Sequence, residues 1–332
     1  MILLKRTRVQ RGSGWPRGLG TLLLLFFAVC TTVGAQAPAS PRRITALDKQ
    51  TILITDLDAD LQGALVALDK ETMQVVWTCA VPGEPLGVAR WKNLYLVGDP
   101  PTGNVVVYRM TGANRGTPCF GAAAGKTLEF LYNLGQAQLR QPGFFQKVND
   151  LAVDVDLQRV FVVDTGDKKV KVFDNKGGFL YAFPEGSPVL LNPTGIALDE
   201  TRQEVLVSDY GDPSGSFKPK VPARIVIFGY GGNYLGQVDS SPANPEFFFS
   251  KPQGLAVDWF GHIFVVDALL GKVIVFARES GTGIKTFGSP GGQPGQLKLP
   301  LDLCLDPSTG DVFVTSNMTG RVEVFRAAGR VP

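Results

Sequence analysis

The chain of 332 residues repeats one short text along most of its length. Residues 252–276 read PQGLAVDWFGHIFVVDALLGKVIVF, and residues 149–173 read NDLAVDVDLQRVFVVDTGDKKVKVF. The other copies are residues 192–211 with 224–228, residues 299–325, a weaker copy at 84–108 and a sixth at 44–69. A chain that repeats with such a period must fold as a series of similar units, each packed against its neighbours.

Each copy consists of short apolar stretches separated by turn residues. Stretches such as FVVD and VIVF are rich in Val, Ile and Phe and are bounded by Gly, Asp, Asn or Pro, which is typical of β-strands. Three stretches per copy are followed in several copies by a fourth, at residues 75–81, 128–135, 178–183, 232–238 and 284–288. Four strands at a period of about 50 residues indicate propeller blades. The sequence therefore predicts an all-β, six-bladed β-propeller of four-stranded antiparallel blades.

Aspartates recur where the first and second strands of the copies end. They are Asp154, Asp199, Asp258 and Asp306 after the first strand, and Asp56, Asp99, Asp164, Asp209 and Asp267 after the second. A carboxylate at such a place accepts hydrogen bonds from the backbone N–H groups of the following turn. An active site needs a unique set of residues, whereas a turn is needed in every blade. We therefore interpret these aspartates as turn-forming rather than catalytic.

Residues 1–35 have the three parts of a secretory signal peptide. Basic residues precede the apolar run LGTLLLLFFAV at 19–29, and small residues lead to an expected cleavage site after Ala35. The apolar run is shorter than the roughly 20 residues of a membrane span, so membrane contact is expected only through an uncleaved leader. We expect a secreted or extracytoplasmic protein, periplasmic in a bacterium, in which residues 36–332 form a single domain.

The charge of the chain argues against a nucleic-acid partner. The formal net charge is +3, but five basic residues and no acidic residue fall within residues 1–35. Residues 36–332 therefore carry 28 Lys and Arg against 30 Asp and Glu, whereas proteins that bind nucleic acid show basic patches. We expect a monomer whose partner is an extracytoplasmic protein or peptide.

Three cysteines remain beyond the leader. An oxidising compartment allows one disulfide, and Cys79 with Cys119 is the expected pair because both fall near the outer edges of neighbouring repeats. Cys304 alternates with leucines in LDLCLD. That pattern predicts a buried free thiol rather than a nucleophile.

Residues 251–276, preceded by FFFS and followed by IKTFG, resemble a full NHL repeat. In that pattern an aromatic residue and Pro-x-Gly precede an AVD stretch, and a VVD stretch and a basic residue precede the final VF. Residues 147–183 and 296–325 match well, 189–238 fairly and 84–135 weakly, and 44–83 are assigned by counting. The resemblance implies a closed six-bladed ring. Residues 42–47 would form either the first strand of the first blade or the missing outer strand of the last.

A single histidine argues against zinc chemistry. The chain resembles the peptide-amidating lyase in fold, but the zinc of that enzyme is held by several histidines, and this chain has only His262. Nucleophilic schemes that pair Ser or Cys with His fail for the same reason. His262 lies in the turn FGHIF, and we interpret it as an ordinary turn residue.

A calcium-dependent lactonase or esterase is the enzymatic alternative, because the chain is similar to the gluconolactonase/regucalcin and paraoxonase groups of six-bladed propellers. Calcium takes six to eight oxygen ligands, and in a propeller these would converge at the channel mouth, just before each innermost strand. The candidate metal ligands there are Asn149, Asp150 and Asp302, and the other mouth residues are Leu86, Thr194 and Gln253. This oxygen supply is small and contains no Glu, so a solvated channel lining without a cofactor is favoured.

Two insertions favour a non-catalytic binding protein. Residues 210–223 separate the second and third strands of the fourth copy, and residues 110–126 separate the third and fourth strands of the second. The candidate contact residues are Phe217, Lys218, Lys220 and Arg115. Long loops on a rigid scaffold are common binding sites, although they can also be tolerated surface decoration. We expect no catalytic residue, and a ligand bound by the loops and the channel mouth.

Overall fold

A computed structural model describes residues 38–58, 60–99, 102–112, 115–135, 143–186, 190–212, 221–240 and 245–327. The predicted leader lies outside these ranges, as do Phe217, Lys218 and Lys220 of the insertion at 210–223. Within the described ranges, no helix is long and apolar enough to cross a membrane.

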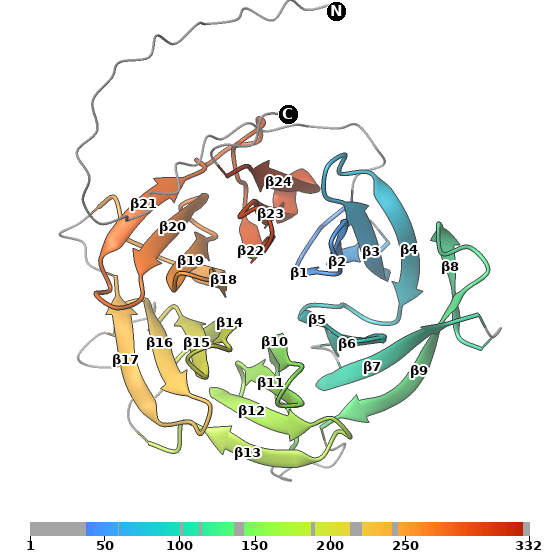
Figure 1. Ribbon diagram of the computed structural model, residues 1–332, viewed down its shortest axis with the longest axis horizontal. Coiled ribbons are helices and arrows are strands. Elements are labelled where there is room, and N and C mark those ends of the chain that lie inside the picture. The colour runs from blue at the N-terminus through green and yellow to red at the C-terminus, as the bar shows by residue number, and fades with distance from the viewer. Residues whose placement is uncertain are drawn as a thin grey trace, which may run out of the picture.

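Six groups of antiparallel strands surround a central axis, which confirms the predicted six-bladed propeller (Figure 1). The innermost strands are β1 (Ile44–Ala46), β5 (Val88–Trp91), β10 (Val148–Asp154), β14 (Pro193–Asp199), β18 (Pro252–Val257) and β22 (Pro300–Leu305). The second strands are β2 (Thr51–Leu57), β6 (Leu94–Asp99), β11 (Arg159–Asp164), β15 (Glu204–Asp209), β19 (His262–Asp267) and β23 (Val312–Ser316). The third strands are β3 (Gly63–Asp69), β7 (Asn104–Thr111), β12 (Lys169–Asp174), β16 (Arg224–Gly229), β20 (Lys272–Ala277) and β24 (Arg321–Phe325). The outer strands are β4 (Val75–Val81), β9 (Thr127–Leu134), β13 (Phe179–Phe183), β17 (Tyr234–Asp239) and β21 (Gly283–Phe287).

The middle strands are largely apolar and buried because each blade is covered on both faces by its neighbours. Strands β15 and β16 are buried at every residue, whereas the outer strand β17 is largely exposed. Between successive blades lies one apolar cluster, and the six clusters together close the ring.

The aromatic residue that ends the third strand is a centre of this packing. Phe173 lies 5.2 Å from Phe145 between ring centroids, and Phe325 lies 4.8 Å from Phe287. Both Phe173 and Phe325 are fully buried. Truncating such a ring to Ala costs about 3–5 kcal/mol, so the recurrence of this aromatic reflects stability.

The aspartates form two kinds of contact. After the first strand, Asp258 accepts the backbone N–H groups of Phe260 and His262 at 2.9 and 2.8 Å, which is the predicted turn. After the second strand, Asp164 reaches farther and accepts the N–H groups of Gln146 and Lys147, both at 2.8 Å. These two residues lie in the loop before the inner strand, so the second aspartate also fixes that loop to the blade.

The ring is closed without a shared strand. β1 pairs with β2, so residues 44–46 belong to the first blade, while the described last blade has three strands, β22, β23 and β24. Thr315 donates its hydroxyl proton to the carbonyl oxygen of Arg42 at 2.9 Å, and Asn317, in the 3-10 helix η1 (Asn317–Thr319), donates to Ser40 at 2.7 Å. Lys70 and Asp306 form a buried ion pair at 3.0 Å across the same seam. Figure 1 shows β22–β24 beside β1–β4.

The insertion at 110–126 contains a strand rather than only a free loop. Within residues 110–126, β8 (Thr117–Gly121) pairs with β4 of the first blade and with β9 of the second, and the two blades become one nine-stranded sheet. Cys79 of β4 and Cys119 of β8, the pair expected from the sequence, are joined by a disulfide. Cys304 is a buried free thiol between the last blade and the first.

Candidate functional site

The inner strands run in the same direction along the axis. Their first residues gather at one face of the ring, which we call the start face, and the turns that follow them lie at the opposite end face (Figure 1). The predicted metal ligands and mouth residues lie at the start face. A cavity at the end face was not predicted.

Arg43 fills the start of the channel. Its Nη2 atom donates to Asn149 Oδ1 and to the carbonyl oxygen of Thr194, both at 2.7 Å, and its Nη1 atom donates to the carbonyl oxygen of Leu301 at 3.1 Å. The side chain is only 2 % exposed. One guanidinium thus joins blades one, three, four and six at the axis.

Two buried carboxylates surround this guanidinium. Arg43 Nη1 lies 3.5 Å from Asp150 Oδ2 and 3.8 Å from Asp302 Oδ1. Burial and the neighbouring Asp150 raise the pKa of Asp302 to about 8, against the opposing effect of Arg43. Burial likewise raises the pKa of Asp150, again opposed by Arg43. The pair of carboxylates is therefore held against a strong desolvation penalty by one arginine.

The structure brings four predicted residues, Asn149, Asp150, Thr194 and Asp302, around Arg43. The other two mouth residues join neighbouring blades through their main chain. The carbonyl oxygen of Leu86 accepts a hydrogen bond from the hydroxyl of Thr55 at 2.7 Å, and that of Gln253 accepts one from Ser208. All six residues therefore contribute to the contacts that hold the start face together.

Glycine is needed where the inner strands approach each other at the axis. A Cβ atom on Gly254 would lie 1.8 Å from Asp302 Oδ1, and one on Gly195 would lie 2.2 Å from the carbonyl oxygen of Gln253. Both distances are far below van der Waals contact. The glycine of the Pro-x-Gly pattern is thus explained by crowding at the axis rather than by a ligand.

The place predicted for calcium already holds the positively charged guanidinium of Arg43. Asn149, Asp150 and Asp302 all face the Arg43 head group. Among the residues that the structure describes, no group of three or more His, Cys, Asp or Glu is arranged to hold a metal ion. Calcium binding by these residues stays a prediction, and it would have to compete with Arg43.

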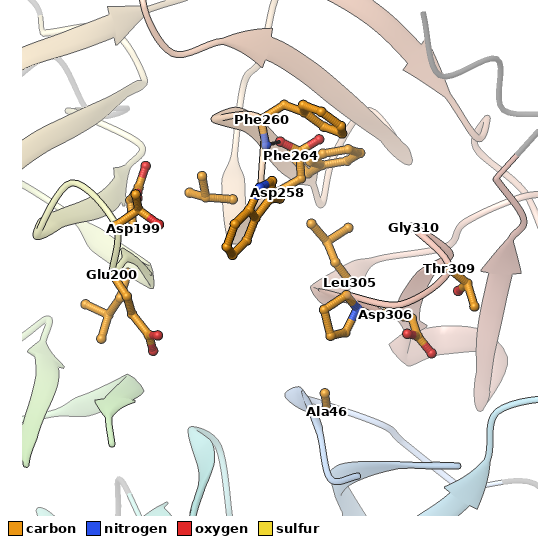
Figure 2. Close-up of a pocket in the computed structure, with 15 residues that line it drawn as sticks. Ala46, Asp199, Glu200, Asp258, Phe260, Phe264, Leu305, Asp306, Thr309 and Gly310 are labelled. Atoms are coloured by element: carbon orange, nitrogen blue, oxygen red, sulfur yellow. Dashed lines mark hydrogen bonds between the residues drawn. The ribbon is translucent and has the colours of Figure 1, made fainter. Parts of the chain in front are cut away.

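The end face opens into a cavity of about 570 Å³, lined by turns that follow β14, β18 and β22 (Figure 2). Figure 2 shows Glu200 on one side, Leu305 and Asp306 opposite it, and Asp258 with Phe260 along a third side. A second cavity, of about 370 Å³, follows the channel and shares lining residues with the first. We call the larger cavity the end-face pocket.

The end-face pocket is acidic. Four of its fifteen lining residues are Asp or Glu, and none is Lys, Arg or His. Three carboxylates have partners: Asp199 pairs with Arg202 at 2.9 Å, Asp258 contacts His262 Nδ1 at 2.8 Å, and Asp306 pairs with Lys70. Glu200 has no hydrogen bond and no ion pair with any described residue.

Burial raises the pKa of Glu200, and so do the nearby carboxylates of Asp154 and Asp156. These two belong to the turn after β10, which therefore lies next to the pocket. The Glu200 side chain is exposed, and no described basic side chain is paired with it.

Large apolar side chains are exposed around the pocket. Trp259 is 89 % exposed and Phe260 is 55 % exposed, and both line the cavity. In the turn after β10, Val155 and Leu157 are 37 % and 47 % exposed. Apolar surface is thus present on both sides of Glu200.

Of the predicted contact residues of the two insertions, only Arg115 lies within the described ranges. Arg115 is exposed, and its carbonyl oxygen accepts a hydrogen bond from Thr127 at 3.2 Å, which fixes the start of the insertion at 110–126. That insertion lies at the outer edge of blades one and two, away from the axis (Figure 1).

Arg43 and Glu200 were not predicted from the sequence, although each has a fixed position relative to the aspartate that follows the first strand of its blade. Arg43 is the fifth residue before Asp48, as Asn149 is before Asp154 and Thr194 before Asp199. The weak first copy hid this register. The residues that follow the first-strand aspartates differ in each blade, namely Val155, Glu200, Trp259 and Pro307.

No protein family model matches the chain. It is 29% identical over 114 residues to lupanine 17-hydroxylase [cytochrome c] of a Pseudomonas species, a match that covers 31% of this chain and 16% of that protein. It is 24% identical over 149 residues to Protein brain tumor of Drosophila melanogaster, which covers 44% of this chain and 13% of that protein. Each match thus spans less than a fifth of the curated relative.

Solved structures match over most of the chain. A structural genomics protein of unknown function from Bacteroides thetaiotaomicron superposes with a TM-score of 0.61 at 15% identity, over 91% of this chain and 72% of that one. A luciferin-regenerating enzyme superposes with a TM-score of 0.60 at 12% identity, over 88% of this chain and 92% of that one. At such identities the likeness shows the propeller fold alone.

Proposed function

We propose that the protein is an exported NHL-type propeller without catalytic activity that binds an extracytoplasmic protein or peptide at the axis of the ring. The NHL-like repeats and the partial match to Protein brain tumor support the NHL type. The leader-like residues 1–35 and the Cys79–Cys119 disulfide support export into an oxidising compartment.

Arg43 is the observation that carries the proposal. In the enzymatic alternative, a calcium-dependent lactonase or esterase, Asn149, Asp150 and Asp302 would have to face the metal. Here Arg43 donates to one of them and lies within 4 Å of the other two. An arginine head group that satisfies these oxygens makes a metal unnecessary for the stability of the start face.

The enzymatic alternative keeps one supporting observation, which is two buried carboxylates and an amide converging on one point of the channel. The likeness to the luciferin-regenerating enzyme adds only fold. This alternative requires calcium to displace the guanidinium.

A metal titration distinguishes the two functions. The thermal melt of the purified protein is recorded with excess calcium and with a chelator, and hydrolysis of a panel of lactones and aryl esters is measured in both conditions. A ligand at about a hundred times its Kd adds about 2.7 kcal/mol and moves the melt by several degrees. We expect neither a shift nor hydrolysis. Calcium-dependent hydrolysis lost in Asp302→Asn would replace our proposal by the lactonase.

Binding itself is tested with a random peptide library panned on the immobilised protein. We expect enriched peptides that, once synthesised, bind with micromolar Kd in calorimetry. A library that yields no binding peptide would contradict the binding function. Export is tested separately by sequencing the N-terminus of the secreted protein, which should begin at Gln36.

A further inference from the structure

The end-face pocket has the size of a ligand site. Ligand pockets usually measure about 300–1,000 Å³, and this one measures about 570 Å³. It is built from turns of the fourth, fifth and last blades, which are fixed by their aspartates and by the inner strands. The cavity is therefore a rigid feature of the ring.

The charge of the pocket selects a cation. Its lining contains four carboxylates and no basic residue. Three of the carboxylates are paired with Arg202, His262 or Lys70, whereas the exposed Glu200 carboxylate has no partner among the described residues. Aromatic rings beside a carboxylate also favour cations, because the ring face is negative. Trp259 and Phe260 supply such rings.

The exposed apolar surface favours a peptide rather than a small molecule as the ligand. Val155 and Leu157 lie in the turn that carries Asp154 and Asp156, the two acids that act on Glu200. Val155 and Leu157 are outside the lining of the cavity and thus add exposed apolar surface in a turn close to Glu200. A small cation would cover only the cavity, whereas a peptide with apolar residues beside a basic one would cover both.

We propose, on the basis of the binding function above, that the end-face pocket receives an arginine or lysine side chain of a partner peptide, with Glu200 as its counter-ion. Apolar residues next to this side chain pack on Trp259 and Phe260 and on Val155 and Leu157. The partner is thus recognised through a basic residue flanked by apolar ones.

A charge-exchange titration tests this pairing. The probes are the capped peptide Gly-Leu-Arg-Leu-Gly, its neutral citrulline analogue and acetyl-arginine amide, each titrated by calorimetry into the full chain at low salt. Tryptophan fluorescence is a second readout, with Trp259→Ala as its control, because Trp259 lines the cavity whereas Trp77 and Trp91 are buried elsewhere. We expect micromolar binding of the arginine peptide and a change in Trp259 emission.

The variants are Glu200→Gln and Trp259→Ala, with Glu84→Gln as the matched control on the start face. Glu84 is an exposed glutamate paired with Arg42 at 3.7 Å. We expect affinity for the arginine peptide to fall about fivefold in Glu200→Gln and at least tenfold in Trp259→Ala, and to stay within twofold in Glu84→Gln. The citrulline peptide should bind the wild type more weakly than the arginine peptide does. The two peptides should bind Glu200→Gln with equal affinity.

Equal affinity of the arginine peptide for the wild type and for Glu200→Gln would overturn the inference, and so would no binding of the arginine peptide up to millimolar concentration. Acetyl-arginine amide that binds as tightly as the arginine peptide would also overturn it, because the ligand would then be a small cation. If library peptides bind but do not depend on Glu200 or Trp259, this inference fails while the binding function stands. Calcium-dependent hydrolysis would instead contradict the function.

Discussion

The two ends of the same channel differ in how their polar groups are satisfied. At the start face, Arg43 contacts Asn149, Asp150 and Asp302, and the arginine and both aspartates are buried. At the end face, Glu200 has no partner among the described residues and Trp259 is exposed. Buried polar groups that satisfy each other hold a structure together, whereas exposed and unpaired groups are free for a ligand. The start face thus closes the ring, and the end face is where we expect recognition.

Arg43→Met should break the start face with the largest effect. The substitution keeps an unbranched side chain but removes the guanidinium, which leaves Asp150 and Asp302 buried without it and costs about 3–5 kcal/mol. The free energy of unfolding is measured by urea denaturation. Arg42→Met is the control, because the Arg42 side chain is paired with the exposed Glu84 at 3.7 Å and its loss should change stability by less than about 1 kcal/mol. Equal effects of the two variants would contradict the role of Arg43.

Gly254→Ala should destabilise the protein by about 1–3 kcal/mol, because the added methyl group meets Asp302 at the axis. The measurement is again urea denaturation. Gly236→Ala, on an outer strand with open space around its Cβ position, should stay within about 0.5 kcal/mol of the wild type. A tolerated Gly254→Ala would mean that the inner strands are less crowded than the structure indicates.

The start face should also lose stability as the pH rises. The folded-state pKa of Asp302 is raised from 3.8 to about 8, so the folded protein binds this proton more tightly than the unfolded chain. The contribution is full below about pH 4 and is lost between pH 4 and pH 8, with a slope of at most about 1.4 kcal/mol per pH unit. Asp302→Asn should flatten this slope in denaturation curves recorded from pH 4 to pH 9. Parallel curves for the two proteins would show that Asp302 is ionised throughout.

Glu200→Gln should have the smallest effect on folding. The carboxylate has no described partner and is close to Asp154 and Asp156, so its removal should change the free energy of unfolding by less than about 0.5 kcal/mol. A thermal melt beside the peptide titration checks this. A large loss of stability would assign Glu200 to the scaffold and remove the contrast between the two faces.

The repeated residues predicted the fold, because repetition is what a ring of equivalent blades requires. The VVD and VF stretches, the recurring aspartates and the closing aromatics all became strands, turns or interblade packing. The second-strand aspartates accept N–H groups of the following turn, as predicted. They also hold a loop that lies about seventeen residues earlier in the chain. Local turn chemistry cannot reveal such a distant partner.

The candidate sites were harder to predict because they depend on residues that do not repeat. Asn149, Asp150 and Asp302 were correctly placed at one mouth, but their common partner Arg43 lies in the most diverged copy. The residues around 110–126 resembled a free loop because β8 pairs not only with β9, which follows it closely, but also with β4, which lies far from it in the chain. Glu200 was overlooked because only the loops before the inner strands were considered, not the turns after them.

The clasp formed by β8 makes the ring mechanically asymmetric. Blades one and two form one nine-stranded sheet, about twice as wide as any other described blade, and the Cys79–Cys119 disulfide links β4 and β8 of that sheet covalently. The seam that closes the ring lies between this sheet and the last blade, which has three strands, β22–β24, within the described residues. Under heat or force, β22–β24 should therefore separate from the ring first. The disulfide-linked sheet of blades one and two should stay folded until the rest of the ring has opened.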